Sequence, residues 1–80
     1  MTIQELHAKI QATKTFLHRE ATRQKIKSEQ DGLSFREIGD RLDMIHEVER
    51  IGVRNLGERE NRKITRMIRE LEQHYKISQN

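Results

Sequence analysis

A helix start is encoded in the stretch Leu33-Ser34-Phe35-Arg36-Glu37-Ile38. Ser34 and Glu37 form a capping box, in which the side chain of each residue accepts a hydrogen bond from the backbone N–H of the other. Leu33 and Ile38 occupy the two positions of a hydrophobic staple, which fixes the angle at which the chain joins the helix. The stretch therefore predicts a helix that begins at Phe35.

The residues before this stretch predict a long N-terminal helix. Thr2 and Glu5 form a second capping box, so we expect a helix to start at residue 3. Apolar side chains then recur at helical spacing, and we predict that they form a face for a partner or a second copy of the chain. These residues are Ile3, Leu6, Ile10 and Leu17.

The C-terminal end of this first helix is open to two interpretations. A helix over 3–27 would be about 37 Å long, whereas a compact domain of this size has a radius of gyration of about 12 Å. Such a helix would project from a monomer, which favours a homodimer or a protein partner. Few apolar residues follow Ala21, so the alternative is a helix that breaks near residue 21 and continues as a linker to residue 30.

The residues after Gly57 predict a C-terminal amphipathic helix over 58–77. Gly57 is a typical helix terminator, and Glu58 and Glu60 suit the positive end of the helix dipole. The apolar face of this helix is formed by Ile64, Met67, Ile68, Leu71 and Tyr75. The fold class is therefore all-α, a single small domain over residues 1–80 with three to four helices.

The composition narrows the class of protein. The chain has 80 residues, of which 32% are hydrophobic and 36% are charged, with no Pro and no Cys. The absence of Cys excludes disulfides, thiolate zinc sites and cysteine nucleophiles, and it fits a reducing compartment. No apolar run approaches the roughly 18 residues that a membrane span requires. We expect a cytoplasmic protein that binds no membrane.

The middle of the chain carries the pattern of a helix-turn-helix over residues 33–57. Two helices that cross steeply need a small residue at their contact and apolar residues on both inner faces. Gly39 supplies the small residue, and the apolar ones are Ile38, Leu42, Val48 and Ile51. The segments LSFREIGDRL (residues 33–42) and EVERIGVRNL (residues 47–56) resemble the two helices in the DNA-binding part of sigma factor region 4.

This resemblance implies a second helix that lies in the major groove of DNA. The residues it places toward DNA are His46, Glu47, Glu49, Arg50 and Arg54, and Arg36 is a further DNA-binding candidate. The alternative is one continuous helix over 35–56, because Asp43 stands where the family has Gly in the turn and Ile45 stands where it has a capping Ser or Thr. A continuous helix would join an antiparallel bundle that has no groove-reading element.

Basic residues recur on the predicted C-terminal helix at spacings of three and four. They are Arg59, Arg62, Lys63, Arg66 and Arg69. Such an arrangement of cations is sufficient for contacts with phosphates, and the formal net charge of the whole chain is +3. We therefore predict phosphate contacts at Arg59, Arg62, Lys63 and Arg66, against the alternative of an ordinary solvated surface.

No catalytic or metal-binding pattern stands out in the sequence. His46 and Glu47 begin like the helix of a zinc protease, but Arg50 occupies the position of the second His. The sequence also lacks a Gly-rich loop that could hold phosphate. We expect no metal, no cofactor and no enzyme activity.

The sequence thus supports two hypotheses about function. The first is a small DNA-binding transcriptional regulator, dimeric, which uses the helix-turn-helix with help from the basic ends of the chain. The second is a non-enzymatic helical module that binds and modulates a partner protein, as small phage and plasmid antagonists or adaptors do. An RNA-binding use of the C-terminal helix is a third option.

Overall fold

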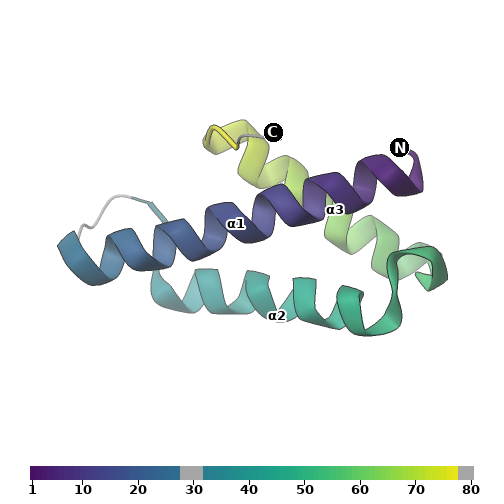
Figure 1. Cartoon of the computed structure of the whole chain (residues 1–80), viewed down its shortest axis with the longest axis horizontal. Coiled ribbons are helices and arrows are strands. Elements are labelled where there is room, and N and C mark those ends of the chain that lie inside the picture. The colour runs from purple at the N-terminus through teal and green to yellow at the C-terminus, as the bar shows by residue number, and fades with distance from the viewer. Residues whose placement is uncertain (28–31, 78–80) are drawn as a thin grey trace.

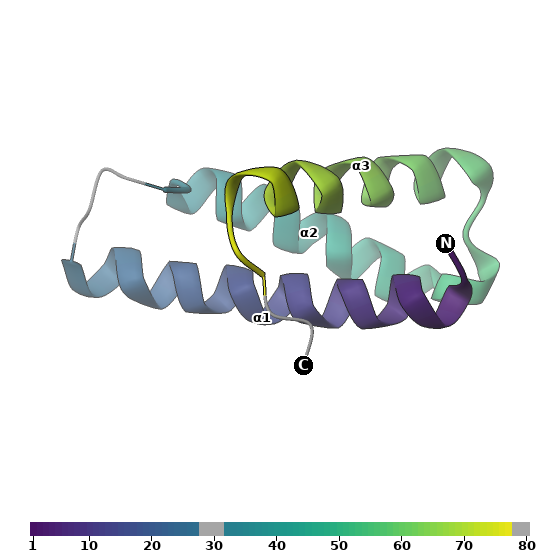
Figure 2. The same ribbon diagram turned by 90° about the horizontal axis from the view of Figure 1, so that it is seen from above.

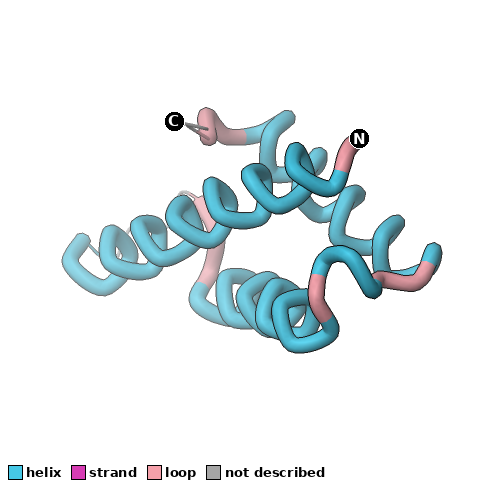
Figure 3. The backbone as a smooth tube through the Cα atoms, turned by 45° about the vertical axis from the view of Figure 1, so that its right-hand side comes forward, coloured by secondary structure: helices cyan, strands magenta, loops and turns pink. Residues whose placement is uncertain are grey.

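Three α-helices form the part of the chain that the computed structural model describes, which is residues 1–27 and 32–77. They are α1 (Ile3–Lys27), α2 (Phe35–Ile51) and α3 (Glu58–His74), and a short 3₁₀ helix, η1 (Val53–Asn55), lies between the last two. Figure 1 shows α1 and α2 running side by side in opposite directions. In Figure 3 the three helices enclose a common centre, so the architecture is an all-α bundle with a long N-terminal helix.

The first helix is unbroken over its 25 residues. The backbone N–H of Glu5 donates to Thr2 Oγ1 at 3.0 Å, which confirms the helix start. The predicted break near residue 21 is wrong, because the second half of α1 still contributes to the interior: Leu17 and Gln24 are buried and Ala21 is half-buried. Packing of these side chains against the rest of the domain therefore stabilises the helix beyond the point where its apolar stripe thins out.

Most of α1 does not project from the domain. The described chain measures 38 × 22 × 16 Å, so its longest dimension is close to the length of α1, and α2 and α3 lie alongside this helix except at its C-terminal end, which extends past them (Figure 2). The estimate from the sequence assumed a near-spherical domain, whereas the helices lie alongside one another in an elongated one. The length of α1 thus gives no reason to expect a dimer.

The start of α2 is the most closely confirmed local prediction. The backbone N–H of Glu37 donates to Ser34 Oγ at 3.2 Å, and the backbone N–H of Ser34 donates to Glu37 Oε1 at 3.2 Å. Leu33 and Ile38 are both buried, as a hydrophobic staple requires. The stretch that begins this helix therefore also attaches it to the core.

The helix-turn-helix predicted over residues 33–57 is not formed. The second helix continues through Asp43, Met44 and Ile45 without interruption and ends at Ile51, so the alternative of a continuous helix is the correct one up to that residue. Ile45 is 0% exposed. Its burial in the core stabilises the helical conformation of residues 43–45, which would form the turn of a helix-turn-helix. Gly52, with φ 96°, then ends the helix in a backbone conformation that favours glycine.

The role expected of Gly39 is wrong for the same reason. A Cβ atom built at this position would meet no other atom within 4 Å, so no neighbouring helix approaches α2 there. A contact at Gly39 would have required the helix crossing that the continuous α2 does not make.

The third helix, α3, begins at Glu58 and ends at His74. Ile64, Met67, Ile68 and Leu71 are buried, which confirms the predicted amphipathic face. Tyr75 follows the helix and lies against Phe16 of α1, with ring centroids 5.2 Å apart. This contact joins α1 to the residue that follows α3.

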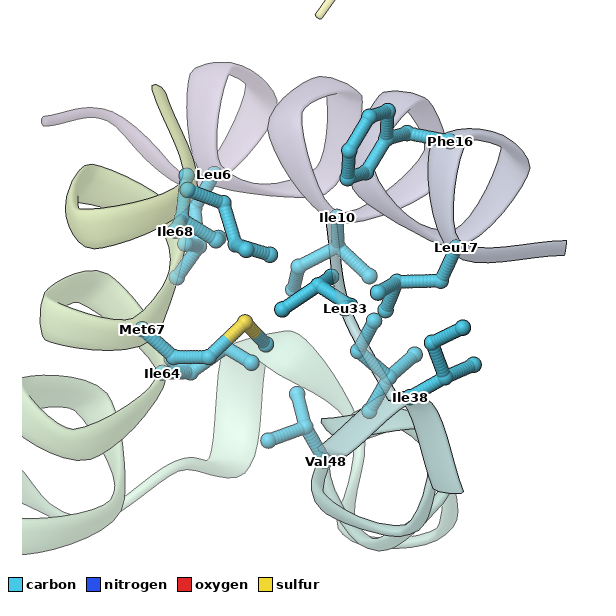
Figure 4. Packing of buried hydrophobic residues seen from close by; sticks show 12 residues of the cluster. Leu6, Ile10, Phe16, Leu17, Leu33, Ile38, Val48, Ile64, Met67 and Ile68 are labelled. Carbon is cyan, nitrogen blue, oxygen red and sulfur yellow. The ribbon is translucent and has the colours of Figure 1, made fainter. Parts of the chain in front are cut away.

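The core is a single cluster to which every helix contributes (Figure 4). The buried members from α1 are Leu6, Ile10, Phe16 and Leu17. Three of the four residues predicted to form a partner face are thus buried inside the domain, and only Ile3 is exposed. The prediction is wrong because the apolar stripe of α1 meets α2 and α3 of its own chain.

Candidate nucleic-acid interface

The outer face of α2 carries residues that the resemblance to sigma factors directs toward DNA. His46, Glu47 and Arg50 are exposed on this helix, and Arg36 near its start and Arg54 in η1 are exposed as well. Arg36 and Arg50 are separated by about 21 Å along the helix axis, at 1.5 Å per residue. These residues therefore do not form one compact patch.

The charges on this face largely cancel. Arg50 Nε donates to Glu47 Oε2 at 3.1 Å, and a terminal nitrogen of the same guanidinium donates to Glu47 Oε1. This hydrogen bonding lowers the pKa of the Glu47 carboxyl and raises the pKa of Arg50, so both groups stay ionised at neutral pH. Asp40 and Asp43 are exposed on the same helix and add two further negative charges. The outer face of α2 offers phosphates little attraction.

Glu49 is turned toward α1, so its predicted position facing DNA is wrong. Its carboxylate accepts hydrogen bonds from Lys14 Nζ at 3.0 and 3.2 Å. The hydrogen bond from Lys14 is the main reason that the pKa of Glu49 is lowered. The pair links α1 to α2, so this carboxylate has a structural partner.

The outer face of α3 carries a basic stripe, which we define as Arg59, Arg62, Lys63, Arg66 and Arg69, all of them exposed. The four arginines follow one another at spacings of three, four and three residues, which places them on one side of a helix over about 15 Å. Arg62 pairs with Glu58 at 2.5 Å, but both side chains are more than 70% exposed, so the pair is weak. The other four side chains make no ion pair or hydrogen bond within the described residues.

Two of the four acidic residues of α3 lie away from this stripe. Glu72 accepts a hydrogen bond from Lys9 Nζ at 2.6 Å and so joins α3 to α1. Glu60 is half-buried close to the start of the helix. Only Glu58 and Glu70 are exposed. The acidic and basic residues of α3 are thus nearly equal in number. Its outer face is nevertheless basic, because half of the acidic residues lie away from that face.

A groove of about 780 Å³ runs beside the basic stripe, between α2 and α3. Three residues of α2 line it, Asp40, Arg41 and Met44, and the remainder come from α3. Sequence reasoning gave no role to Arg41 or Met44. No signal in the sequence marks them, because the groove exists only where two helices meet.

Two other classes of site find no support in residues 1–27 and 32–77. These residues hold no group of three or more His, Asp or Glu side chains that could bind a metal ion. None of the helices they form is long and apolar enough to cross a membrane.

The comparisons with known proteins give no further direction: no family model, no curated protein and no solved structure matches this chain.

Proposed function

We propose that the chain is a non-enzymatic nucleic-acid-binding domain that contacts the phosphates of duplex DNA through the basic stripe of α3. The observation that carries the proposal is the set of four cations without acidic partners, Arg59, Lys63, Arg66 and Arg69, on one exposed helix face. Cations of this kind release condensed counterions when they approach phosphates, which drives binding without any base contact.

The proposal keeps the partner expected from the sequence but moves the contact from α2 to α3. The α2 face combines Arg50 with a bound Glu47 and with two exposed aspartates, whereas the α3 face has an excess of basic charge. Phosphate contacts alone position a protein on a duplex without reading its sequence. We therefore infer binding that is governed mainly by backbone charge.

The test is fluorescence anisotropy of a labelled mixed-sequence DNA duplex titrated with the full chain at several salt concentrations. Four phosphate contacts predict that log affinity falls with log salt at a slope of about −3.6, from about −0.9 per contact. The double variant Arg66→Gln, Arg69→Gln should reduce the magnitude of this slope by about 1.8. It should weaken binding most at the lowest salt concentration.

The matched control is the double variant Arg36→Gln, Arg54→Gln. It removes the same charge from exposed positions on α2 and η1. The proposal predicts that the affinity of this control variant for DNA falls with salt at almost the same slope as that of the wild type. Equal loss in the two double variants would mean that only net charge matters, and absence of binding at low salt would exclude the function.

A further inference from the structure

The groove between α2 and α3 lies on the side of these helices that α1 does not cover. All of its lining residues belong to α2 or α3. In Figure 3 these two helices form two sides of the bundle, and α1 forms the remaining side. A further helix could therefore be added here without displacing any part of the fold.

The floor of the groove is apolar. Met67 is buried at 5% exposure, and Met44 on the facing helix is half-buried. Methionine side chains are flexible and polarizable, and they adapt to apolar groups of different shapes. Phosphate groups gain nothing from such a floor, so it indicates a ligand with apolar side chains.

The edges of the groove are rich in cations. Five basic side chains line the groove against three acidic ones, Asp40, Glu58 and Glu70. Arg59, Lys63 and Arg66 on its α3 side have no acidic partner within the described part of the chain. On the α2 side, a terminal nitrogen of Arg41 donates to the Glu37 carbonyl oxygen at 3.1 Å. Arg41 Nε is buried and has no hydrogen-bond partner. The Arg41 side chain lines the groove and so adds a cation to its α2 side.

We propose that the groove binds an acidic amphipathic helix of a partner protein. The apolar face of that helix would cover Met44 and Met67, and its carboxylates would meet the cations of α3 and Arg41. Binding of this type, in which a helix lies in a groove, uses apolar anchors at spacings of three and four residues. The groove extends along α3 from Glu58 to Glu70, about 18 Å, which corresponds to three to four turns of a bound helix.

A second copy of the chain does not fit this description. Among residues 1–25 and 32–77, the large apolar side chains that are exposed are Met1, Ile3 and Phe35. They do not form a series at helical spacing on an acidic helix. The charge and shape of the groove therefore favour a different protein. Arg59, Lys63 and Arg66 belong both to the groove and to the proposed DNA contact, so Arg69, which lies outside the groove, is the residue that separates the two.

The probe is a fluorescein-labelled synthetic peptide of four helical turns, with Leu at positions i, i+3, i+4 and i+7 of successive turns and Glu elsewhere. We expect it to bind the full chain, whereas the same peptide with Lys in place of each Glu should not bind. Met44→Gln keeps a side chain of similar length and helix propensity. This variant and Lys63→Gln should each weaken peptide binding about tenfold.

The matched control is Arg69→Gln, which removes a charge from the basic stripe outside the groove. It should change peptide affinity less than about twofold. It should still weaken DNA binding, so failure of the groove and failure of the proposed function give different results. Circular dichroism of each variant checks that the fold is retained.

Methyl NMR of the three methionines locates the bound peptide directly. The signals of Met44 and Met67 should shift on addition of the peptide, and the signal of Met1, which lies outside the groove, should not. Two results would each overturn the proposal: no binding of the acidic peptide, or equal binding of the Lys peptide.

Discussion

Replacement of Gly39 by Ala should make the domain more stable. Gly39 lies in the interior of α2, where Gly costs about 0.8–1.0 kcal/mol relative to Ala. A Cβ atom at this position meets nothing within 4 Å, so no steric term opposes the gain. We expect Gly39→Ala to raise the free energy of unfolding by about 1 kcal/mol, and the melting temperature by about 4–8 °C.

The assay is urea unfolding followed by far-UV circular dichroism, with the denaturation midpoint and the slope m fitted separately. The midpoint should rise while m stays constant, because the surface exposed on unfolding does not change. The control is Gly52→Ala, at a φ of 96°, which should lower stability by about 1–3 kcal/mol.

The sign of the Gly39→Ala effect is what decides between the two structures of this region. In a helix-turn-helix, an added methyl group at the helix contact would force the helices apart and destabilise the domain. A loss of stability of 1 kcal/mol or more, at the scale of about 1–3 kcal/mol for overpacking, would therefore refute the continuous α2 and the reasoning that rests on it.

Three further predictions concern the core, a helix cap and a surface ion pair. Leu17→Ala should lower the free energy of unfolding by about 2–5 kcal/mol in the same urea assay, because Leu17 is fully buried; a smaller loss would contradict its place in the core. Ser34→Ala should cost about 1 kcal/mol. Hydrogen bonds from the backbone N–H of Ser34 and, second, from its side chain hold the pKa of Glu37 below its ordinary value, so the wild type should lose stability as the pH falls through that lowered pKa. Ser34→Ala removes only the side-chain bond and should lose slightly less stability in acid; a larger loss than in the wild type would contradict this. A double-mutant cycle with Lys14→Ala and Glu49→Ala should give a coupling of about 0.2–1 kcal/mol, reduced at high salt, and a salt-independent coupling would be inconsistent with a solvent-exposed pair.

The local signals in the sequence predicted helix starts well. The capping box at Ser34 and the hydrogen bond from the Glu5 N–H to Thr2 act between residues three apart, so their geometry depends only on the local chain. At Thr2 the second bond of the predicted capping box does not form, because the Glu5 carboxylate accepts from the Thr2 hydroxyl and not from its backbone N–H. The amphipathic face of α3 was equally clear because Ile64, Met67 and Leu71 repeat at the helical period. Signals of this kind depend only on residues within a few turns of one helix.

The middle of the chain was ambiguous because two structures use the same apolar residues. Ile38 and Val48 must be buried both in a helix-turn-helix and in one continuous helix. The residue that separates the two structures is Ile45, which is fully buried in the core of the bundle. Its environment includes residues distant in sequence, so a pattern read along α2 alone does not determine it.

In the candidate site too, features within one helix could be predicted from the sequence, and contacts between helices could not. The basic stripe of α3 could be read from the spacing of its arginines, since it belongs to a single helix. The pairing of Glu72 with Lys9 could not, because the two residues are separated by 63 positions. That pairing leaves the outer face of α3 more basic than its composition indicates.

The contacts between the first and last helices have a consequence for synthesis on the ribosome. Lys9 meets Glu72 across 63 positions of the chain, and Phe16 meets Tyr75. At about 5–20 residues per second, the ribosome needs roughly 3 to 13 seconds to add the residues that separate the ion pair. Throughout that interval the apolar stripe of α1 lacks its last partner. Nascent chains of this protein are therefore most exposed to chaperones and proteases during translation, and the bundle closes only after Tyr75 has emerged.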